Sequence, residues 1–330
     1  MKNLKNIAQA MVSPGKGILA ADESTPTCTK RFTALKIEST ESSRNRYRSM
    51  LLSANNLNQY ISGVILFDET FYQNMIDTSQ TIPQYLKSKN ILTGIKVDTG
   101  AKSLAKHPGE KITEGLDNLR ERLQKYHMEG ADFAKWRAVI TINKNIPSDT
   151  CMHANAHALA RYASLCQENS IVPIVEPEVL MEGNHNINTC YEVTDKILKI
   201  VFQELKLLKV DLEAMVLKPN MVLSGLENNE KISEDTVAKM TYDVLNKNVP
   251  KEVPGIAFLS GGQSSDLATQ RLNNLNKLYG NEKSWNLTFS YGRGLQQDAL
   301  LNWATGNTKK AQEALIYRAK MNQHASLGKL

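Results

Sequence analysis

The sequence has few of the residues that commonly bind metals, since only four of its 330 residues are cysteines and six are histidines. The cysteines are scattered, without the paired spacing of a zinc site, which indicates free thiols in a reducing cytoplasm; they are Cys28, Cys151, Cys166 and Cys190. His153 and His157 stand four residues apart, but the glutamate of the H-E-x-x-H motif is missing between them. Residues 15–20 resemble a G-x-G-x-x-A dinucleotide motif, but they precede a predicted strand rather than joining a strand to a helix. We therefore expect neither a metal ion nor a cofactor.

Long apolar runs, blocks of like charge and linkers rich in proline, glycine or serine are also missing. No apolar run approaches the ~20 residues of a membrane span, and residues 1–7 lack the apolar segment of a signal peptide, so we expect a cytoplasmic protein without a membrane partner. The 40 lysines and arginines exceed the 34 acidic residues by only six, and they are dispersed. This modest positive charge suits a small anionic substrate better than a nucleic acid. Without a linker, residues 1–330 are predicted to form a single domain.

Eight apolar runs that end in polar residues recur about every 30 to 45 residues. They cover residues 17–22, 63–67, 93–98, 133–140, 172–178, 214–218, 255–260 and 286–290. Helical patterns lie between them, at residues 116–127 (opened by Thr113 and Glu114), 153–167, 194–208, 233–246 and 266–279. This alternation predicts a (β/α)8 TIM barrel with additional terminal helices, in which the polar strand ends converge on one site. A doubly wound open sheet is the alternative.

The run at residues 214–218 ends in Lys218, which is followed by Pro219. Lysine is rarely buried unless it is paired or neutral, and a lysine with a lowered pKa is a nucleophile suited to Schiff-base chemistry. Lys96 and Lys135 are predicted to end two further strands, and neighbouring ammonium groups would lower the pKa of at least one of the three. The more ordinary interpretation of a lysine at a strand end is a salt bridge or a solvent-reaching side chain.

Other charged residues occur in patterns that point to the same place. Residues two apart lie on one face of a strand, and two such pairs are present, Lys135 with Arg137 and Glu176 with Glu178. An ion-pair layer inside the barrel is the alternative to a catalytic site. Asp22 follows the first strand and would be either a general base or part of a helix cap.

Two short turns after the last two predicted strands have the composition of phosphate sites. Residues 260–264 (Ser-Gly-Gly-Gln-Ser) precede a predicted helix, whose free N–H groups suit an oxyanion. Residues 291–294 (Tyr-Gly-Arg-Gly) add Arg293, whose guanidinium can bind phosphate through two hydrogen bonds. Their place in the barrel is where phosphates commonly bind.

These segments closely resemble the class I, Schiff-base fructose-1,6-bisphosphate aldolases, from about residue 14 to residue 329. The matching segments are GKGILAADEST (15–25), GVILF (63–67), GIKVD (94–98), ADFAKWR (131–137), IVPIVEPE (171–178), LKPNMV (217–222), FLSGGQS (258–264) and LTFSYGR (287–293).

The resemblance implies a role for each matching residue in cleaving fructose 1,6-bisphosphate to dihydroxyacetone phosphate and glyceraldehyde 3-phosphate. Lys218 would form the Schiff base, Glu176 would dehydrate the carbinolamine, Asp22 would take the C4 hydroxyl proton and Lys135 would position the substrate. The residues implied to bind the C1 phosphate are Ser260, Gly261, Gly262, Gly292 and Arg293. Those implied to bind the other phosphate are Ser24, Arg31 and Lys96. Arg137 and Glu178 would be supporting charges, and Arg44 would lie near the substrate. The family also implies a cytosolic homotetramer that needs no metal.

The sequence departs from the family at a few positions. Ala214 stands for a usual glycine, Pro26-Thr27 for a common Gly-Ser, and Thr99 for a common lysine. The printed sequence ends without the terminal tyrosine that, in animal enzymes of the family, assists proton transfer at C1. We therefore expect proton exchange at C1 of dihydroxyacetone phosphate to be slow relative to cleavage. Alternative functions are a Schiff-base enzyme for another sugar, such as fructose 1-phosphate or a transaldolase substrate, and a non-catalytic scaffold that binds a phosphosugar or a protein.

Overall fold

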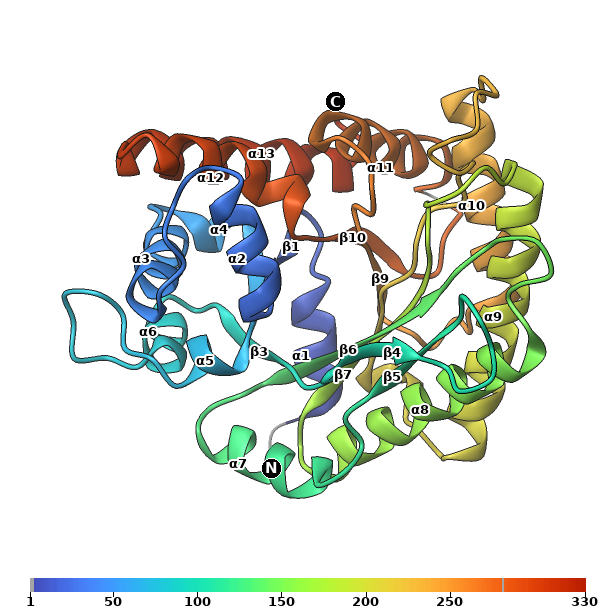
Figure 1. Cartoon of the computed structure of the whole chain (residues 1–330), viewed down its shortest axis with the longest axis horizontal. Helices are drawn as coiled ribbons and strands as arrows, with labels where there is room; N and C mark the ends of the chain where they lie inside the picture. The colour runs from blue at the N-terminus through green and yellow to red at the C-terminus, as the bar shows by residue number, and fades with distance from the viewer. Residues whose placement is uncertain (1–2, 281) are drawn as a thin grey trace.

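The structure is a computed structural model that describes residues 3–280 and 282–330. Its central feature is a closed barrel of parallel strands (Figure 1). In order around the barrel these are β1 (Gly17–Ala21), β2 (Ile61–Leu66), β3 (Leu92–Lys96), β6 (Phe133–Ile140), β7 (Val172–Val179), β8 (Val216–Leu217), β9 (Gly255–Phe258) and β10 (Asn286–Tyr291). The predicted eight strands and the (β/α)8 barrel are confirmed, and the open doubly wound sheet is wrong.

Helices surround the barrel and cover its outer face (Figure 1). They are α1 (Leu4–Met11), α2 (Thr25–Thr33), α3 (Glu41–Leu52), α4 (Leu57–Tyr60), α5 (Asp68–Phe71), α6 (Ile82–Ser88), α7 (Leu119–Met128), α8 (Asp149–Glu168), α9 (Ile187–Leu207), the 3-10 turn η1 (Leu212–Ala214), α10 (Glu234–Asn248), α11 (Ser265–Tyr279), α12 (Arg293–Ala304) and α13 (Thr308–Ser326). Four of the long helices begin where a capping side chain accepts a hydrogen bond from a backbone N–H three residues on, at Ser148, Asn186, Ser233 and Ser264. Within the described ranges, no helix has both the length and the apolar character needed to cross a membrane.

Helix α1 closes the N-terminal end of the barrel. Its residues Ala8 and Met11, with Val12 just after it, are buried in one cluster with inward-facing residues of several strands. Val12 packs directly on Gly255 at the start of β9, where an added Cβ would lie 2.5 Å from the valine side chain. The hydroxyl of Ser62, on β2, donates to Met11 O at 2.6 Å. The opposite end, where the strands finish, is therefore the end left for a site.

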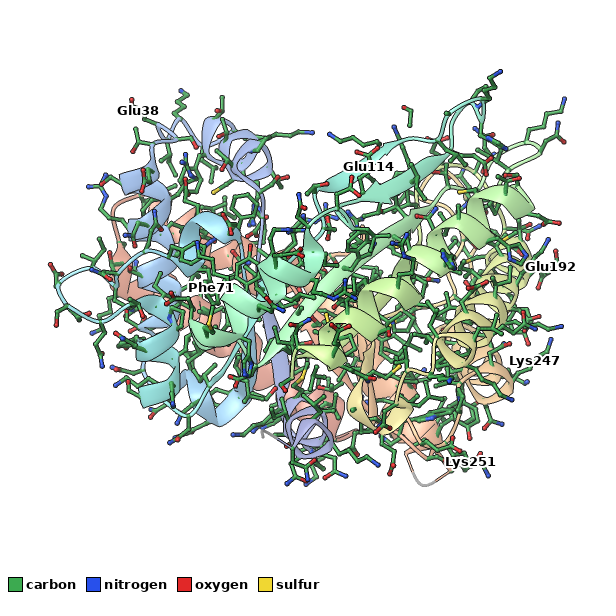
Figure 2. The ribbon with its side chains drawn as sticks, turned by 90° about the horizontal axis from the view of Figure 1, so that it is seen from below. Glu38, Phe71, Glu114, Glu192, Lys247 and Lys251 are labelled. Carbon is green, nitrogen blue, oxygen red and sulfur yellow. The ribbon has the colours of Figure 1, made fainter. Side chains whose placement is uncertain are left out.

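A hairpin outside the barrel was not predicted. Strands β4 (Gly100–Ser103) and β5 (Lys111–Glu114) pair antiparallel, and Figure 2 labels Glu114 beside them. The prediction that Thr113 and Glu114 open a helix is wrong, because the Thr113 hydroxyl donates to Arg137 O of β6 at 2.7 Å instead of capping a helix. Helix α7 begins later, after Asn118, which has a φ of 53°. The hairpin is short and polar, so it carries little periodic signal.

Candidate active site

Four charged side chains meet toward the end of the barrel where the strands finish: Lys135 of β6, Glu176 of β7, and Asp22 and Lys218, which directly follow β1 and β8. Lys135 Nζ lies 2.7 Å from an Asp22 carboxylate oxygen and 3.4 Å from Glu176 Oε2, and Lys218 Nζ lies 3.2 Å from Glu176 Oε1. Lys135, Glu176 and Lys218 are buried, with residue exposures of 5%, 3% and 4%. Cations and carboxylates therefore alternate in one row, Asp22, Lys135, Glu176, Lys218.

Lys135 is not at the end of its strand, contrary to the prediction, because β6 continues to Ile140 in register with β7. In the register between β3 and β6, Lys135 nevertheless stands opposite Lys96, the last residue of β3. Strands in a closed barrel are tilted and staggered, so a mid-strand residue of β6 reaches the level at which β3 ends.

Lys218 is fixed by the backbone on both sides of it. Its N–H donates to Val175 O at 2.8 Å, and Leu259 N–H donates to Pro219 O at 3.2 Å. Strand β8 stops at Leu217, just before Lys218 and Pro219, and proline has no N–H to extend the ladder. The Asn220 side chain then anchors the loop, accepting from Val179 N–H at 3.0 Å and donating to the Thr194 hydroxyl at 3.1 Å.

The alternating charges shift the pKa values of Asp22 and Lys135, the first two groups of the row. Burial by itself raises the pKa of Asp22, but Lys135 and Lys218 outweigh it and lower that pKa to about 2. Burial likewise lowers the pKa of Lys135, but the Asp22 and Glu176 carboxylates outweigh it and raise that pKa. Asp22 is thus ionised and Lys135 is charged at neutral pH. Lys135 is therefore not the lysine whose pKa neighbouring cations lower.

A second ion-pair group surrounds the start of α2. Glu23 pairs with Arg31 and, at 2.8 Å, with Arg48, which also donates to Glu23 O at 3.2 Å. Arg48 is only 2% exposed and lies on α3. The pairs hold α2 and α3 against the end of β1, next to Asp22.

A hollow of about 630 Å³ opens between the start of α2 and the end of β3, and none of the four residues of the charged row lines it. Its lining includes Ser24, Lys96 and Arg137, three of the predicted substrate-binding residues. Lys96 Nζ lies 2.6 Å from an Asp98 carboxylate oxygen, and Arg137 pairs with Glu178. The cations are therefore held in fixed directions at the edge of a space large enough for a small ligand.

The two predicted phosphate turns lie side by side, because β9 and β10 are neighbours in the barrel. Arg293 Nη2 donates to Gly261 O at 2.5 Å and so links them. Gly261 has a φ of +55°, which favours glycine. Within the part of the chain that the structure describes, the N–H groups of Gly261 and Gly262 donate to no protein acceptor. Together with Gly292, which precedes the first residue of α12, the turns present free donors to an anion.

Arg44, like Arg31 and Lys96, is held by other protein groups. Its guanidinium donates to Glu69 Oε1 at 2.8 Å and to Ser39 Oγ at 3.2 Å. Its contact with a substrate stays a prediction.

Sequence reasoning missed Arg48, Asp98 and Asn220, which touch the predicted residues or their neighbours. Asp98 ends one predicted strand, Asn220 follows another, and both stand inside matching motifs, so their position was a usable signal. Arg48 lies on a polar helix and gave none. Among residues 3–280 and 282–330, no three His, Cys, Asp or Glu side chains are grouped so as to hold a metal ion.

Comparisons with known proteins identify the family to which the chain is similar. The sequence family described as "Fructose-bisphosphate aldolase class-I" matches residues 3–330. A Xanthomonas campestris pv. campestris protein named "Probable fructose-bisphosphate aldolase class 1" is 52% identical, over 100% of this chain and 98% of its own length. "Fructose-bisphosphate aldolase 4, cytosolic" of Arabidopsis thaliana is 48% identical, over 96% of this chain and 80% of its own length.

A solved structure is similar over nearly the whole chain. It is the fructose-bisphosphate aldolase of Plasmodium falciparum in complex with TRAP and a small molecule inhibitor. The TM-score is 0.96 and the identity 45%, covering 99% of this chain and 94% of that chain.

Proposed function

Because the chain belongs to the class-I fructose-bisphosphate aldolase family, a family of lyases, we propose that it cleaves fructose 1,6-bisphosphate through a Schiff base on Lys218. The observation that carries this assignment is the 3.2 Å contact between Lys218 Nζ and Glu176 Oε1, with both groups buried. Lys218 has no second carboxylate partner among the described residues, whereas Lys135 contacts both Asp22 and Glu176.

The contact provides both groups that the first step needs. Transfer of one proton from Lys218 to Glu176 leaves a neutral amine and a carboxylic acid. The amine attacks the C2 carbonyl of the ketose to form a carbinolamine. Glu176 then returns the proton to the departing hydroxyl, water leaves, and a protonated imine remains on Lys218.

We assign Asp22 to the cleavage step. Its lowered pKa keeps it ionised, so it can accept the C4 hydroxyl proton as the C3–C4 bond breaks. The bonding electrons pass to the imine and give an enamine, and the aldehyde fragment is released. Protonation of the enamine and hydrolysis of the imine then free the dihydroxyacetone phosphate. Lys135, held between Asp22 and Glu176, positions the substrate and stabilises the developing charge.

We assign the two phosphates to the two cationic regions beside the row. The C1 phosphate would bind the turns joined by the Arg293–Gly261 hydrogen bond, with donors from Ser260, Gly261, Gly262, Gly292 and Arg293. The second phosphate would bind in the hollow, near Ser24, Lys96 and Arg31. Arg137 and Glu178, already paired with each other, would support that side.

Borohydride reduction in the presence of dihydroxyacetone phosphate tests the assignment of the Schiff-base lysine. We expect one label, mapped by mass spectrometry to the peptide that contains Lys218. Lys218→Arg keeps the charge but cannot form the imine, so it should lose both the label and turnover while its circular dichroism stays unchanged. A label on Lys96 or Lys135 in the wild-type protein would contradict the proposal.

We also propose a cytoplasmic homotetramer without a nucleic-acid or membrane partner. The family resemblance and the cytosolic plant relatives support the location and assembly. The dispersed excess of six positive charges supports a small anionic substrate. Light scattering of the purified protein should give four times the mass of one chain, and a monomer or dimer mass would contradict the assembly.

A further inference from the structure

A second lysine with unusual surroundings lies at the opposite end of the barrel from the active site. Lys283, between α11 and β10, faces a cavity of about 210 Å³. The cavity is bounded by the α1–β1 connection, the end of α11, the start of β10 and the end of α13. It is thus separate from the charged row, which lies toward the strand ends.

The cavity provides no opposite charge for this lysine. No aspartate or glutamate is among the described residues that line it, and the ion pairs of the described chain do not include Lys283. The hydroxyls of Ser13 and Ser326 donate to the backbone oxygens of Ala10 and Gln323, at 2.9 and 2.8 Å. Burial without a counter-charge lowers the pKa of Lys283 to about 8.

One hydrogen bond orients the Lys283 amine. Its Nζ donates to Asn276 Oδ1, and the Asn276 amide is itself fixed by donating to Leu272 O at 3.0 Å and to Leu287 O at 3.2 Å. A neutral amine can donate one N–H to this acceptor and keep its lone pair free. The amine is half-buried, so small reagents can reach it from the cavity.

We propose that Lys283 is an acylation site that reacts with small acyl phosphates entering this cavity. The Nζ lone pair forms a bond to the acyl carbon, the carbon–oxygen bond to phosphate breaks, and the phosphate leaves with the bonding electrons. One proton of the amine passes to water. The product is a neutral amide, so the reaction removes the charge that burial disfavours.

Acetyl phosphate is the probe for the test, applied to the full-length protein near neutral pH. Mass spectrometry would follow the acetylation rate of each lysine separately, and Lys277, exposed on the preceding helix α11, is the matched reference. At a pH of about 7.5, roughly a quarter of an amine with a pKa of about 8 is neutral, against roughly 0.1% for an ordinary lysine. We expect Lys283 to react about tenfold faster than Lys277, allowing for its partial burial and weaker basicity.

A variant that adds the missing counter-charge tests whether Lys283 reacts fast because the cavity lacks a carboxylate or only because acetyl phosphate can reach it. Asn286 also lines the cavity, and Asn286→Asp adds a carboxylate without a change in size. The carboxylate should raise the pKa of Lys283 and slow its acetylation toward the rate of Lys277, which itself should not change. Acetylation of wild-type Lys283 no faster than Lys277, or an Asn286→Asp rate equal to wild type, would overturn the proposal.

Discussion

Replacing Lys135 with methionine tests whether the charged row is an electrostatic unit. Lys135 contacts Asp22 at 2.7 Å and Glu176 at 3.4 Å, and its side chain is 6% exposed. Methionine fills a similar volume but removes the cation between the Asp22 and Glu176 carboxylates, so that only Glu176 keeps an ion pair, with Lys218. Breaking a buried pair by removing one partner costs about 3–5 kcal/mol, so we expect the free energy of unfolding at neutral pH to fall by that amount.

The double variant separates the pair from its surroundings. Asp22→Asn alone removes the carboxylate and leaves Lys135 with Glu176, which Lys218 already contacts. Asp22→Asn with Lys135→Met removes one charge of each sign and leaves the Glu176–Lys218 pair intact. We therefore expect the double variant to be less destabilised than the sum of the single changes, by about 2–3 kcal/mol.

Urea unfolding followed by circular dichroism, at one protein concentration for all four proteins, measures these energies. The pH dependence gives a second measurement. The pKa of Asp22 falls from 3.8 to about 2 on folding, so its ionised form stabilises the fold above pH 3.8 by about 2 kcal/mol. This stabilisation is lost as the pH falls through about 2, and Asp22→Asn should lack it. Strictly additive effects of the two substitutions would refute the reasoning.

Three further predictions concern the phosphate turns, the barrel interior and the chemistry. Arg293→Ala should lower kcat/KM for fructose 1,6-bisphosphate by roughly 30-fold, corresponding to about 2 kcal/mol, while the thermal unfolding temperature stays unchanged. A lower unfolding temperature with normal turnover would show a structural role instead. Gly94→Ala would place a Cβ 2.2 Å from the Phe133 ring, so the free energy of unfolding should fall by about 1–3 kcal/mol, and an unchanged melting temperature would contradict this packing. Turnover should survive EDTA, because the protonated imine on Lys218 accepts the electrons of the broken bond; a loss that zinc reverses would count against the Schiff base.

The barrel could be predicted because its strands differ strongly from their surroundings. Buried parallel strands appear as short apolar runs, and their regular recurrence identified the closed topology. The β4–β5 hairpin had no such signal, since β5 reads Lys-Ile-Thr-Glu and only Thr113 of its four residues is buried. Thr113 before a helical pattern resembles a cap in sequence, and its bond to Arg137 O exists only once β6 is in place.

The site residues were predicted as a set, but their pairing was not. Lys96, Lys135 and Lys218 indicated a group of cations, whereas the structure inserts Glu176 between two of them and raises the pKa of Lys135. Arg48 shows the limit of sequence reasoning most clearly. It lies 25 residues from Glu23, and their contact depends on how α3 packs against the end of β1.

The closure of one barrel end by α1 has a kinetic consequence. Met11 and Val12 fill that end, so under the proposed function the substrate and both products would pass through the other end, where the strands finish. Under the proposed roles, the ketone fragment remains covalently attached to Lys218 after the carbon–carbon bond breaks, and only the aldehyde is free to diffuse away. The aldehyde must therefore leave before the imine is hydrolysed if cleavage is not to reverse. The shared path and the covalent bond to Lys218 together set the order in which the two products leave.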